Sequence, residues 1–281
     1  MREIASECLR EAVKKLFIEA NYILPDSLCK TVDSCAAAER DELARSILGK
    51  LRENREEAGK IDVPVCQDTG MAVLFVELGE EVHVTGGHIR AIIDEGVADA
   101  YRDGFLRKSV VRDPLFDRTN TNDNTPAVVH FDIVPGDRIR LTAAPKGFGS
   151  ENMSKTKMFK PTASKEDIVA FVTDTVREAV SNPCPPVVVG VGIGGTFEYA
   201  ALLAKKALTR DVGSHHADAN YAALEDEMLT RINALGIGPQ GFGGDTTALG
   251  VMIETYPTHI AGLPCAVNIG CHVTRHASVT I

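Results

Sequence analysis

The stretch PVVVGVGIGG, residues 186–195, decides the fold class of this chain. Its valines predict a buried strand over residues 186–192, because β-branched side chains favour strands. A segment with helical spacing follows directly, over residues 196–210. A buried strand that passes straight into a helix is typical of an α/β protein.

The glycines of this stretch also satisfy the pattern GxGxxG from Gly190 to Gly195. Between a strand and a helix, that pattern is typical of a loop that binds the pyrophosphate of a dinucleotide. Such folds continue with a second strand that ends in Asp or Glu about 20 residues later, whereas this chain runs through residues 211–216 into another helical segment. The glycines could equally allow close packing of backbones. A dinucleotide-binding protein is therefore the alternative from a different class.

The rest of the chain mixes helical and strand patterns. We expect a mixed α/β fold in a single domain over residues 1–281, with a helical N-terminal segment of about residues 1–60 packed on alternating helices and strands around a mixed sheet. A turn at Pro135 predicts a hairpin, and Ser164 is expected to cap a helix. The expected helices further along cover residues 87–106, 164–181, 196–210 and 217–235, and the expected strands cover residues 71–78, 127–134, 137–143, 186–192, 248–254 and 265–269.

The composition excludes several classes of protein. The 281 residues carry 30 Lys and Arg against 39 Asp and Glu, a formal net charge of −9. No run of basic residues exceeds a pair, so neither a nucleic-acid surface nor an anionic membrane surface is indicated. No apolar run approaches the roughly 20 residues that span a membrane, and no secretory signal follows Met1. We expect a cytoplasmic protein with a small-molecule site.

Seven cysteines are spread along the chain. In a reducing compartment they act as buried apolar side chains, nucleophiles or metal ligands rather than disulfides. Cys66, Cys184 and Cys271 each lie in an expected loop at a strand end, beside Pro or Gly, whereas Cys265 begins a strand. Three thiolates can hold three irons of a cubane cluster, although small buried thiols near turns would show the same pattern. The other cysteines, expected in helical core positions, are Cys8, Cys29 and Cys35.

Four motifs in order carry a resemblance to a known family. They are VPVCQDTG at residues 63–70, KGFGSENMS at 146–154, CPP at 184–186 with the glycine run after it, and GIGPQGFGGD at 236–245. Together they resemble the iron–sulfur hydro-lyases of the class I fumarase and L-tartrate dehydratase family. The resemblance covers essentially the whole chain. It corresponds to the α subunit of a two-subunit enzyme, equivalent to the N-terminal half of single-chain members.

The resemblance implies that Cys66, Cys184 and Cys271 hold a [4Fe-4S] cluster, whose unique iron binds the carboxylate and hydroxyl oxygens of the substrate. The reaction it implies is reversible trans-elimination of water. An open iron acts there as a Lewis acid that polarises the hydroxyl, while a base removes a proton from the adjacent carbon. An open iron also implies sensitivity to oxidants.

The resemblance further implies which residues face the substrate. Gln67 and Asp68 follow the first ligand, Arg107 is implied to bind a substrate carboxylate, and Gly149 is implied to contact the substrate through its backbone. Asp68 and His259 are implied to be catalytic. An arginine suits this role, since its guanidinium can bind a carboxylate with two parallel N–H bonds. Without the family, Arg107 could be a solvated helix end, and Asp68 and His259 could be turn residues.

Zinc is a weaker possibility. His272 and His276 follow Cys271, and the segment His215-His216 stands near Asp218, but structural zinc sites normally use tight ligand pairs such as CxxC. We therefore interpret His272 and Arg275 as groups that surround the cluster.

The resemblance also implies a partner and a substrate. A β subunit is expected to supply the base, a threonine, with further Arg and Lys ligands for the carboxylates, in an α2β2 assembly, so the chain alone should be inactive. Residues 149–153 and 244–248 look closer to fumarases, so fumarate hydratase is the favoured activity. The alternative is the α subunit of L-tartrate dehydratase.

Overall fold

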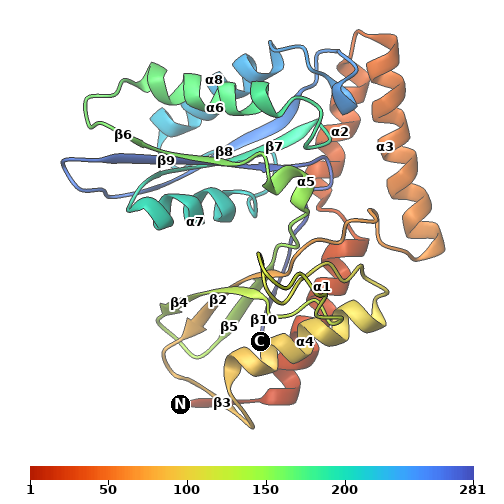
Figure 1. Ribbon diagram of the computed structural model, residues 1–281, viewed down its shortest axis with the longest axis vertical. Coiled ribbons are helices and arrows are strands. Elements are labelled where there is room, and N and C mark those ends of the chain that lie inside the picture. Colours follow the sequence, from red (N-terminus) through yellow and green to blue (C-terminus); the bar gives the residue numbers. More distant parts are fainter. The chain divides into compact units, whose positions relative to one another are not determined.

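The computed structural model describes residues 1–281 and divides the chain into two compact units (Figure 1). Unit 1 comprises residues 1–24, 57–148 and 275–281, and unit 2 comprises residues 25–56 and 149–274. Because the chain passes repeatedly between the units, no single linker in the sequence separates them. The prediction of one domain over residues 1–281 stays a prediction.

Unit 1 contains a mixed four-stranded sheet in the order β10-β5-β2-β4. Strand β2 runs parallel to β4 and antiparallel to β5, and β10 is antiparallel to β5. A short parallel pair joins β1 and β3. The elements of this unit are β1 (Arg2–Ala5), α1 (Ser6–Tyr22), β2 (Val73–Gly79), β3 (Val82–Thr85), α4 (Ile89–Asp103), β4 (Val128–Val134), β5 (Ile139–Ala143) and β10 (Ala277–Thr280).

Helices α1 and α4 form the core of unit 1 with this sheet. The helical spacing of Leu9, Val13 and Phe17 places all three on the buried face of α1. They belong to one apolar cluster with Val97 of α4 and Leu74 of β2. The amphipathic pattern expected near the N-terminus is therefore confirmed for α1.

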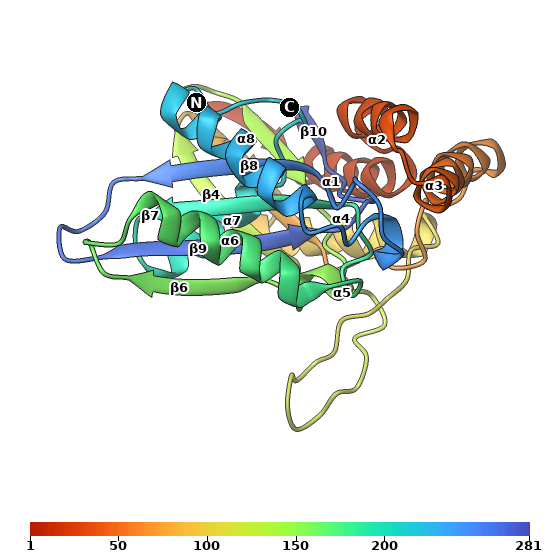
Figure 2. The ribbon, with the colours of Figure 1, turned by 90° about the horizontal axis from the view of Figure 1, so that it is seen from above.

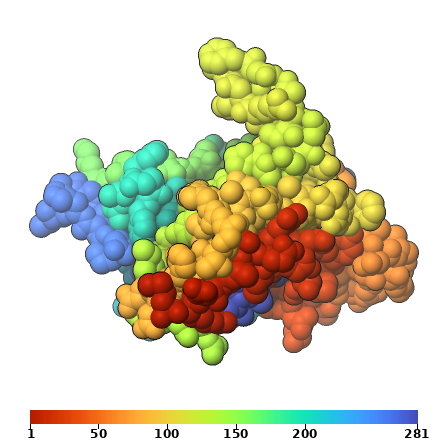
Figure 3. All heavy atoms as spheres, turned by 90° about the horizontal axis from the view of Figure 1, so that it is seen from below, coloured from red at the N-terminus to blue at the C-terminus, as the bar shows by residue number.

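A long loop without helix or strand connects α4 to β4, and it stands away from the elements of unit 1 in Figures 2 and 3, where it is yellow-green. Its two sides meet at a single bridge between Val111 and Asn120. Asp113 accepts N–H groups from Leu115 and Phe116, although both apolar side chains are exposed.

Unit 2 contains a second mixed sheet in the order β6-β9-β7-β8. Helices α6 and α8 cover one face of this sheet and α7 covers the other, as Figures 1 and 2 show. Helix α2 contacts β8, and Arg55 of α3 pairs with Asp33 of α2. The elements of unit 2 are α2 (Asp26–Ala38), α3 (Glu42–Ile61, whose last turn belongs to unit 1), α5 (Phe148–Glu151), β6 (Lys155–Phe159), α6 (Lys165–Ala179), β7 (Val187–Gly194), α7 (Phe197–Ala207), α8 (Ala219–Asn233), η1 (Pro239–Gly241), β8 (Ala248–Tyr256) and β9 (Leu263–Gly270).

Strand β7 owes its place in the middle of this sheet to alternation along the valine and glycine run. Val189 and Val191 lie in the apolar cluster that includes residues of α6 and α8. Gly190 and Gly192 alternate with them and face α7, where an added Cβ would come within 2.1 Å of the Ala204 carbonyl oxygen and 2.0 Å of the Ala200 carbonyl oxygen, respectively. Successive residues of a strand point to opposite faces. Large residues therefore meet two helices on one face, while the glycines let α7 approach on the other.

The mixed α/β class and the elements on either side of residue 195 are confirmed. Ser164 also caps α6 as expected, because its side chain accepts the Asp167 amide while the Asp167 carboxylate accepts the Ser164 amide. Each helix is too short or too polar to span a lipid bilayer.

One detail of the predicted architecture is wrong. Strands β4 and β5 do not form the hairpin predicted around Pro135, because β2 lies between them and pairs with both. The apolar β2, buried over most of its length, takes the central position that satisfies both neighbours. The strands form three sheets, and α1 belongs to unit 1 while α2 belongs to unit 2.

Candidate active site

Two of the predicted site residues meet in unit 1, one from the loop before β2 and one from the segment after α4. The Arg107 Nη1 atom donates to Gln67 Oε1 at 2.8 Å. The hydroxyl of Thr69 accepts the Arg107 amide at 2.8 Å and donates to the Arg107 carbonyl at 3.2 Å. The guanidinium and the amide side chain are both exposed. Main-chain contacts therefore hold Arg107 beside Gln67, and its outer N–H groups can reach an anionic ligand.

Asp68 is half-buried and held by backbone amides. Its Oδ1 atom accepts the Gly70 amide at 3.1 Å, and its Oδ2 atom accepts the Phe148 amide at 3.2 Å. A Cβ at Gly147 would lie 3.0 Å from Oδ2, so the absence of a side chain there lets the loop approach the carboxylate. An ionised carboxylate has about four acceptor positions, so Asp68 keeps capacity for a substrate hydroxyl or proton.

Two buried residues that sequence reasoning missed support this loop. The Tyr101 hydroxyl donates to the Gly70 carbonyl at 2.8 Å, and the Asn124 side chain donates to the same oxygen at 3.2 Å. The Asn124 amide oxygen also accepts the Ser109 amide at 2.7 Å. Burial raises the pKa of Tyr101 well above its usual range, which keeps it a neutral donor. Asn124 is fully buried, and the burial of a polar side chain becomes visible only in the structure.

The loops of Cys184 and Cys271 meet at one end of the sheet of unit 2. The Cys184 carbonyl accepts the His272 amide at 3.3 Å and the His272 Nδ1 atom at 3.0 Å. Cys184 is exposed and has a positive φ of 53°. The Cys271 Sγ atom accepts the Val273 amide at 3.4 Å. Two of the three predicted ligand loops are thus joined by hydrogen bonds.

Gly149 lies in α5 of unit 2, next to a network of polar side chains. Glu151 pairs with Lys205 of α7 through one carboxylate oxygen and accepts the Asn268 side-chain amide at 2.8 Å through the other. Asn268 also donates to Ser154 at 2.9 Å. Since Asn268 lies three residues before Cys271, this network ties the Gly149 segment to the strand that leads to that cysteine.

These loops carry the motifs by which the chain is compared with known proteins. The family model described as fumarate hydratase (Fumerase) matches residues 10–280. The chain belongs to this family. A Methanocaldococcus jannaschii protein named putative L(+)-tartrate dehydratase subunit alpha is 41% identical over 276 residues, which is 96% of each chain.

A second relative of this chain is the L(+)-tartrate dehydratase subunit alpha of Escherichia coli K12. It is 32% identical over 283 residues, which is 97% of this chain and 92% of the relative. The family and these relatives indicate a hydro-lyase. The named relatives are tartrate dehydratase subunits, so they support the predicted alternative better than the favoured fumarate hydratase activity.

The chemistry of the cysteines in this family member fits thiolate ligands of an iron–sulfur cluster. None of the seven cysteines takes part in a disulfide bond. Cys66, Cys184 and Cys271 lie in loops with some exposure, and the Cys271 Sγ atom accepts a backbone N–H. By contrast, burial raises the pKa of Cys265 to about 12. No group of three or more His, Cys, Asp or Glu side chains stands close enough together to hold a metal ion.

His259 lies away from the cysteine loops of unit 2. It follows β8 and precedes β9, whereas Cys271 follows β9 and Cys184 precedes β7. Because β7 and β9 are antiparallel, His259 lies at the opposite end of the sheet from both cysteines. Its Nδ1 atom accepts the Ala261 amide at 3.1 Å, as in a turn. Its catalytic role stays a prediction.

The structure also bears on the dinucleotide and zinc alternatives. Gly190 and Gly192 lie inside β7 and pack against α7, so close packing explains them. A dinucleotide-binding fold needs a second strand parallel to β7 after one helix. Strand β8 is parallel to β7, but both α7 and α8 come between these two strands in the sequence. In the other histidine cluster, His216 Nδ1 accepts the Asp218 amide at 2.9 Å, so this ring nitrogen serves a turn.

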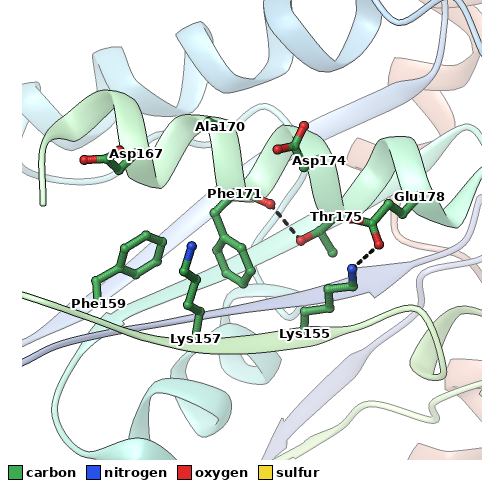
Figure 4. Close-up of a pocket in the computed structure, with 9 residues that line it drawn as sticks. All are labelled: Lys155, Lys157, Phe159, Asp167, Ala170, Phe171, Asp174, Thr175 and Glu178. Carbon is green, nitrogen blue, oxygen red and sulfur yellow. Dashed lines mark hydrogen bonds and ion pairs between the residues drawn. The ribbon is translucent and has the colours of Figure 1, made fainter.

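A cavity of about 370 Å³ lies between β6 and α6 in unit 2 (Figure 4). It contains none of the predicted site residues. Its charges are largely matched within the protein, because Lys155 pairs with Glu178 and the Lys157 Nζ atom lies 4.4 Å from the ring centre of Phe159. The cavity therefore offers little unpaired charge to an anionic substrate.

Proposed function

We propose that this chain is the α subunit of an iron–sulfur hydro-lyase that acts on L(+)-tartrate. The observation that carries the substrate is the 41% identity over 96% of both chains to a relative named for tartrate. The fumarate hydratase description of the family model makes L-malate the second candidate. Both substrates are 2-hydroxy dicarboxylates, so the same dianion-binding residues suit either.

The proposed ligands of a [4Fe-4S] cluster are Cys66, Cys184 and Cys271. When bound, the cluster would supply a Lewis-acidic iron that polarises the hydroxyl to be eliminated. Support comes from the family, from the strand-end loops that carry these cysteines, and from the backbone N–H that Cys271 Sγ accepts.

The chain's own residues would bind and orient the dianion. Arg107 is exposed and braced by Thr69, so it would bind one carboxylate while Gln67 sets the direction of its guanidinium. Gly149 would contact the substrate through its backbone. Asp68, held by two amides, would accept the substrate hydroxyl or hold its proton.

A β subunit is part of the proposal, since the relatives are named as α subunits. It would supply the base that removes the proton from carbon, together with further cationic ligands for the carboxylates. We propose an α2β2 assembly.

The test is anaerobic co-expression of this chain with the β subunit, followed by iron and sulfide analysis and assays on L(+)-tartrate and L-malate. We expect a larger kcat/KM for tartrate. A larger value for malate would overturn the substrate proposal and establish the second candidate. Cys184→Ser should lose the cluster and its visible absorption, whereas Cys8→Ser, on the exposed side of α1, should keep both. A cluster retained at full occupancy in Cys184→Ser would contradict the ligand set.

A further inference from the structure

Arg275 is a buried cation whose hydrogen bonds are incomplete. It lies in the segment between Cys271 and β10, and only 4% of its surface is exposed. Its Nη2 atom donates to the main-chain oxygen of Asp68. Its Nε and Nη1 atoms are shielded from solvent and have no hydrogen-bond partner.

Such an arrangement is costly without a further acceptor. A guanidinium stays charged at every pH that proteins experience, and a buried charge without a full set of partners strongly destabilises the folded state. The carboxylate of Asp68 is turned to other donors, the amides of Gly70 and Phe148. The two free nitrogens therefore require an acceptor that the polypeptide does not provide.

The sequence neighbours of Arg275 and of its partner indicate which acceptor this is. Arg275 comes four residues after Cys271, and Asp68 comes two residues after Cys66. These two cysteines are proposed cluster ligands. A substrate carboxylate would satisfy the guanidinium only while substrate is bound, and would leave a buried unpaired charge in the resting enzyme. A resident anionic group satisfies it permanently.

We propose that Arg275 donates its Nε and Nη1 hydrogens to sulfur atoms of the iron–sulfur cluster and so sets the electronic state of the cluster. This inference rests on the proposed cluster. Arg275 is a positioning residue here, since its third nitrogen holds the main chain of Asp68 while the other two face the cluster. Hydrogen bonds to sulfur and nearby positive charge raise the reduction potential of such clusters.

The test compares wild type, Arg275→Lys and Arg275→Gln in the anaerobic α–β complex, with the exposed Arg52→Gln as control. The readouts are the reduction potential and the EPR spectrum of the reduced cluster. We expect a more negative potential and altered g-values in Arg275→Gln, with Arg275→Lys between it and wild type. Iron retention should weaken about 10- to 100-fold in Arg275→Gln, the range seen for groups that support metal ligands. Unchanged potential and spectrum in both variants at full cluster occupancy would overturn the inference and would indicate a buried water as the acceptor.

A second measurement covers variants that do not retain the cluster. In the cluster-free complex the Nε and Nη1 atoms of Arg275 have no acceptor, so Arg275→Gln should melt at or above the temperature of wild type. A clear loss of thermal stability in that form would show that the contact with Asp68 is the whole role of Arg275, and would overturn the inference. Failure of the wild-type complex to bind iron and sulfide would instead refute the proposed function, and the inference with it.

Discussion

At the scale of single residues, the candidate site depends on how backbone groups orient charged side chains. Arg107 is anchored through its amide and carbonyl to Thr69, so its guanidinium is free to face outward beside Gln67. In a chain with a net charge of −9, such a local cation gives a dianionic substrate a place to bind.

We expect Arg107→Lys to lower kcat/KM by about 100-fold or more, since lysine keeps the charge but loses the two parallel N–H bonds to a carboxylate. The rate should be measured on tartrate in the α–β complex. Arg112→Lys, in the same exposed loop region, is the matched control and should change kcat/KM less than threefold, an estimate on the order of a weak surface interaction. Equal effects of the two substitutions would remove Arg107 from the substrate site.

Backbone groups also hold the buried carboxylate of Glu39, and this contact leads to a prediction about stability. It is 2% exposed and accepts hydrogen bonds from the amides of Asp245 and Thr246 and from the Thr246 hydroxyl. Burial acts to raise the pKa of Glu39, but the hydrogen bonds from Asp245, Asp41 and Thr246 outweigh it and lower the pKa overall. Glu39 thus ties the end of α2 to the loop before β8.

Glu39→Gln should lower the free energy of unfolding by about 1–3 kcal/mol at neutral pH. Because the folded pKa is lowered, the contribution of Glu39 is present above the unfolded value of about 4.3 and is lost as the pH falls through the folded pKa. The difference between wild type and variant should therefore shrink below about pH 4 in urea unfolding. The exposed Glu19→Gln should change little at either pH, and a difference independent of pH would contradict this account.

At the scale of elements, the contact between β7 and α7 shows how one pattern can serve two interpretations. Gly190 and Gly192, two of the glycines that match a dinucleotide-binding pattern, alternate along β7 and face α7. The same alternation directs the valines toward α6 and α8. Packing between strand and helix therefore accounts for these glycines without a ligand.

Gly192→Ala should destabilise the protein by about 1–3 kcal/mol or more, because a Cβ would lie 2.0 Å from the Ala200 carbonyl oxygen and α7 would have to shift. Gly49→Ala is the control, since it lies within α3 with open space around it, and it should stabilise by about 0.5–1 kcal/mol. Thermal unfolding of both variants measures these effects. A neutral Gly192→Ala would show that α7 does not need the close approach.

At the scale of the whole molecule, the chain is organised as two units, each assembled from stretches that lie far apart in the sequence. The named relatives that cover nearly all of this chain are α subunits.

We therefore expect the purified chain alone to have no measurable hydro-lyase activity, even after anaerobic reconstitution with iron and sulfide. Addition of the β subunit should restore turnover and yield a complex of both chains in size-exclusion chromatography with light scattering. Addition of an unrelated acidic protein of similar size is the control. Full activity of the chain alone would refute the need for a partner.

The sequence by itself determined the local features of this protein. Side-chain periodicity was enough to predict β7, α7 and the helix capped by Ser164, because these depend on residues a few positions apart. The four motifs were enough to predict the family, which the match over residues 10–280 bears out. Motif similarity also pointed to Gln67 and Arg107, which the structure places in contact.

Only the tertiary structure decided which distant segments meet. The insertion of β2 between β4 and β5 depends on burial of a central apolar strand, which no local turn signal reports. Arg275 lies 207 residues from Asp68, and its unsatisfied nitrogens are visible only once the chain has folded around them. Local patterns arise from interactions between near neighbours, whereas strand order and buried hydrogen bonds arise from contacts between residues that the chain must first bring together.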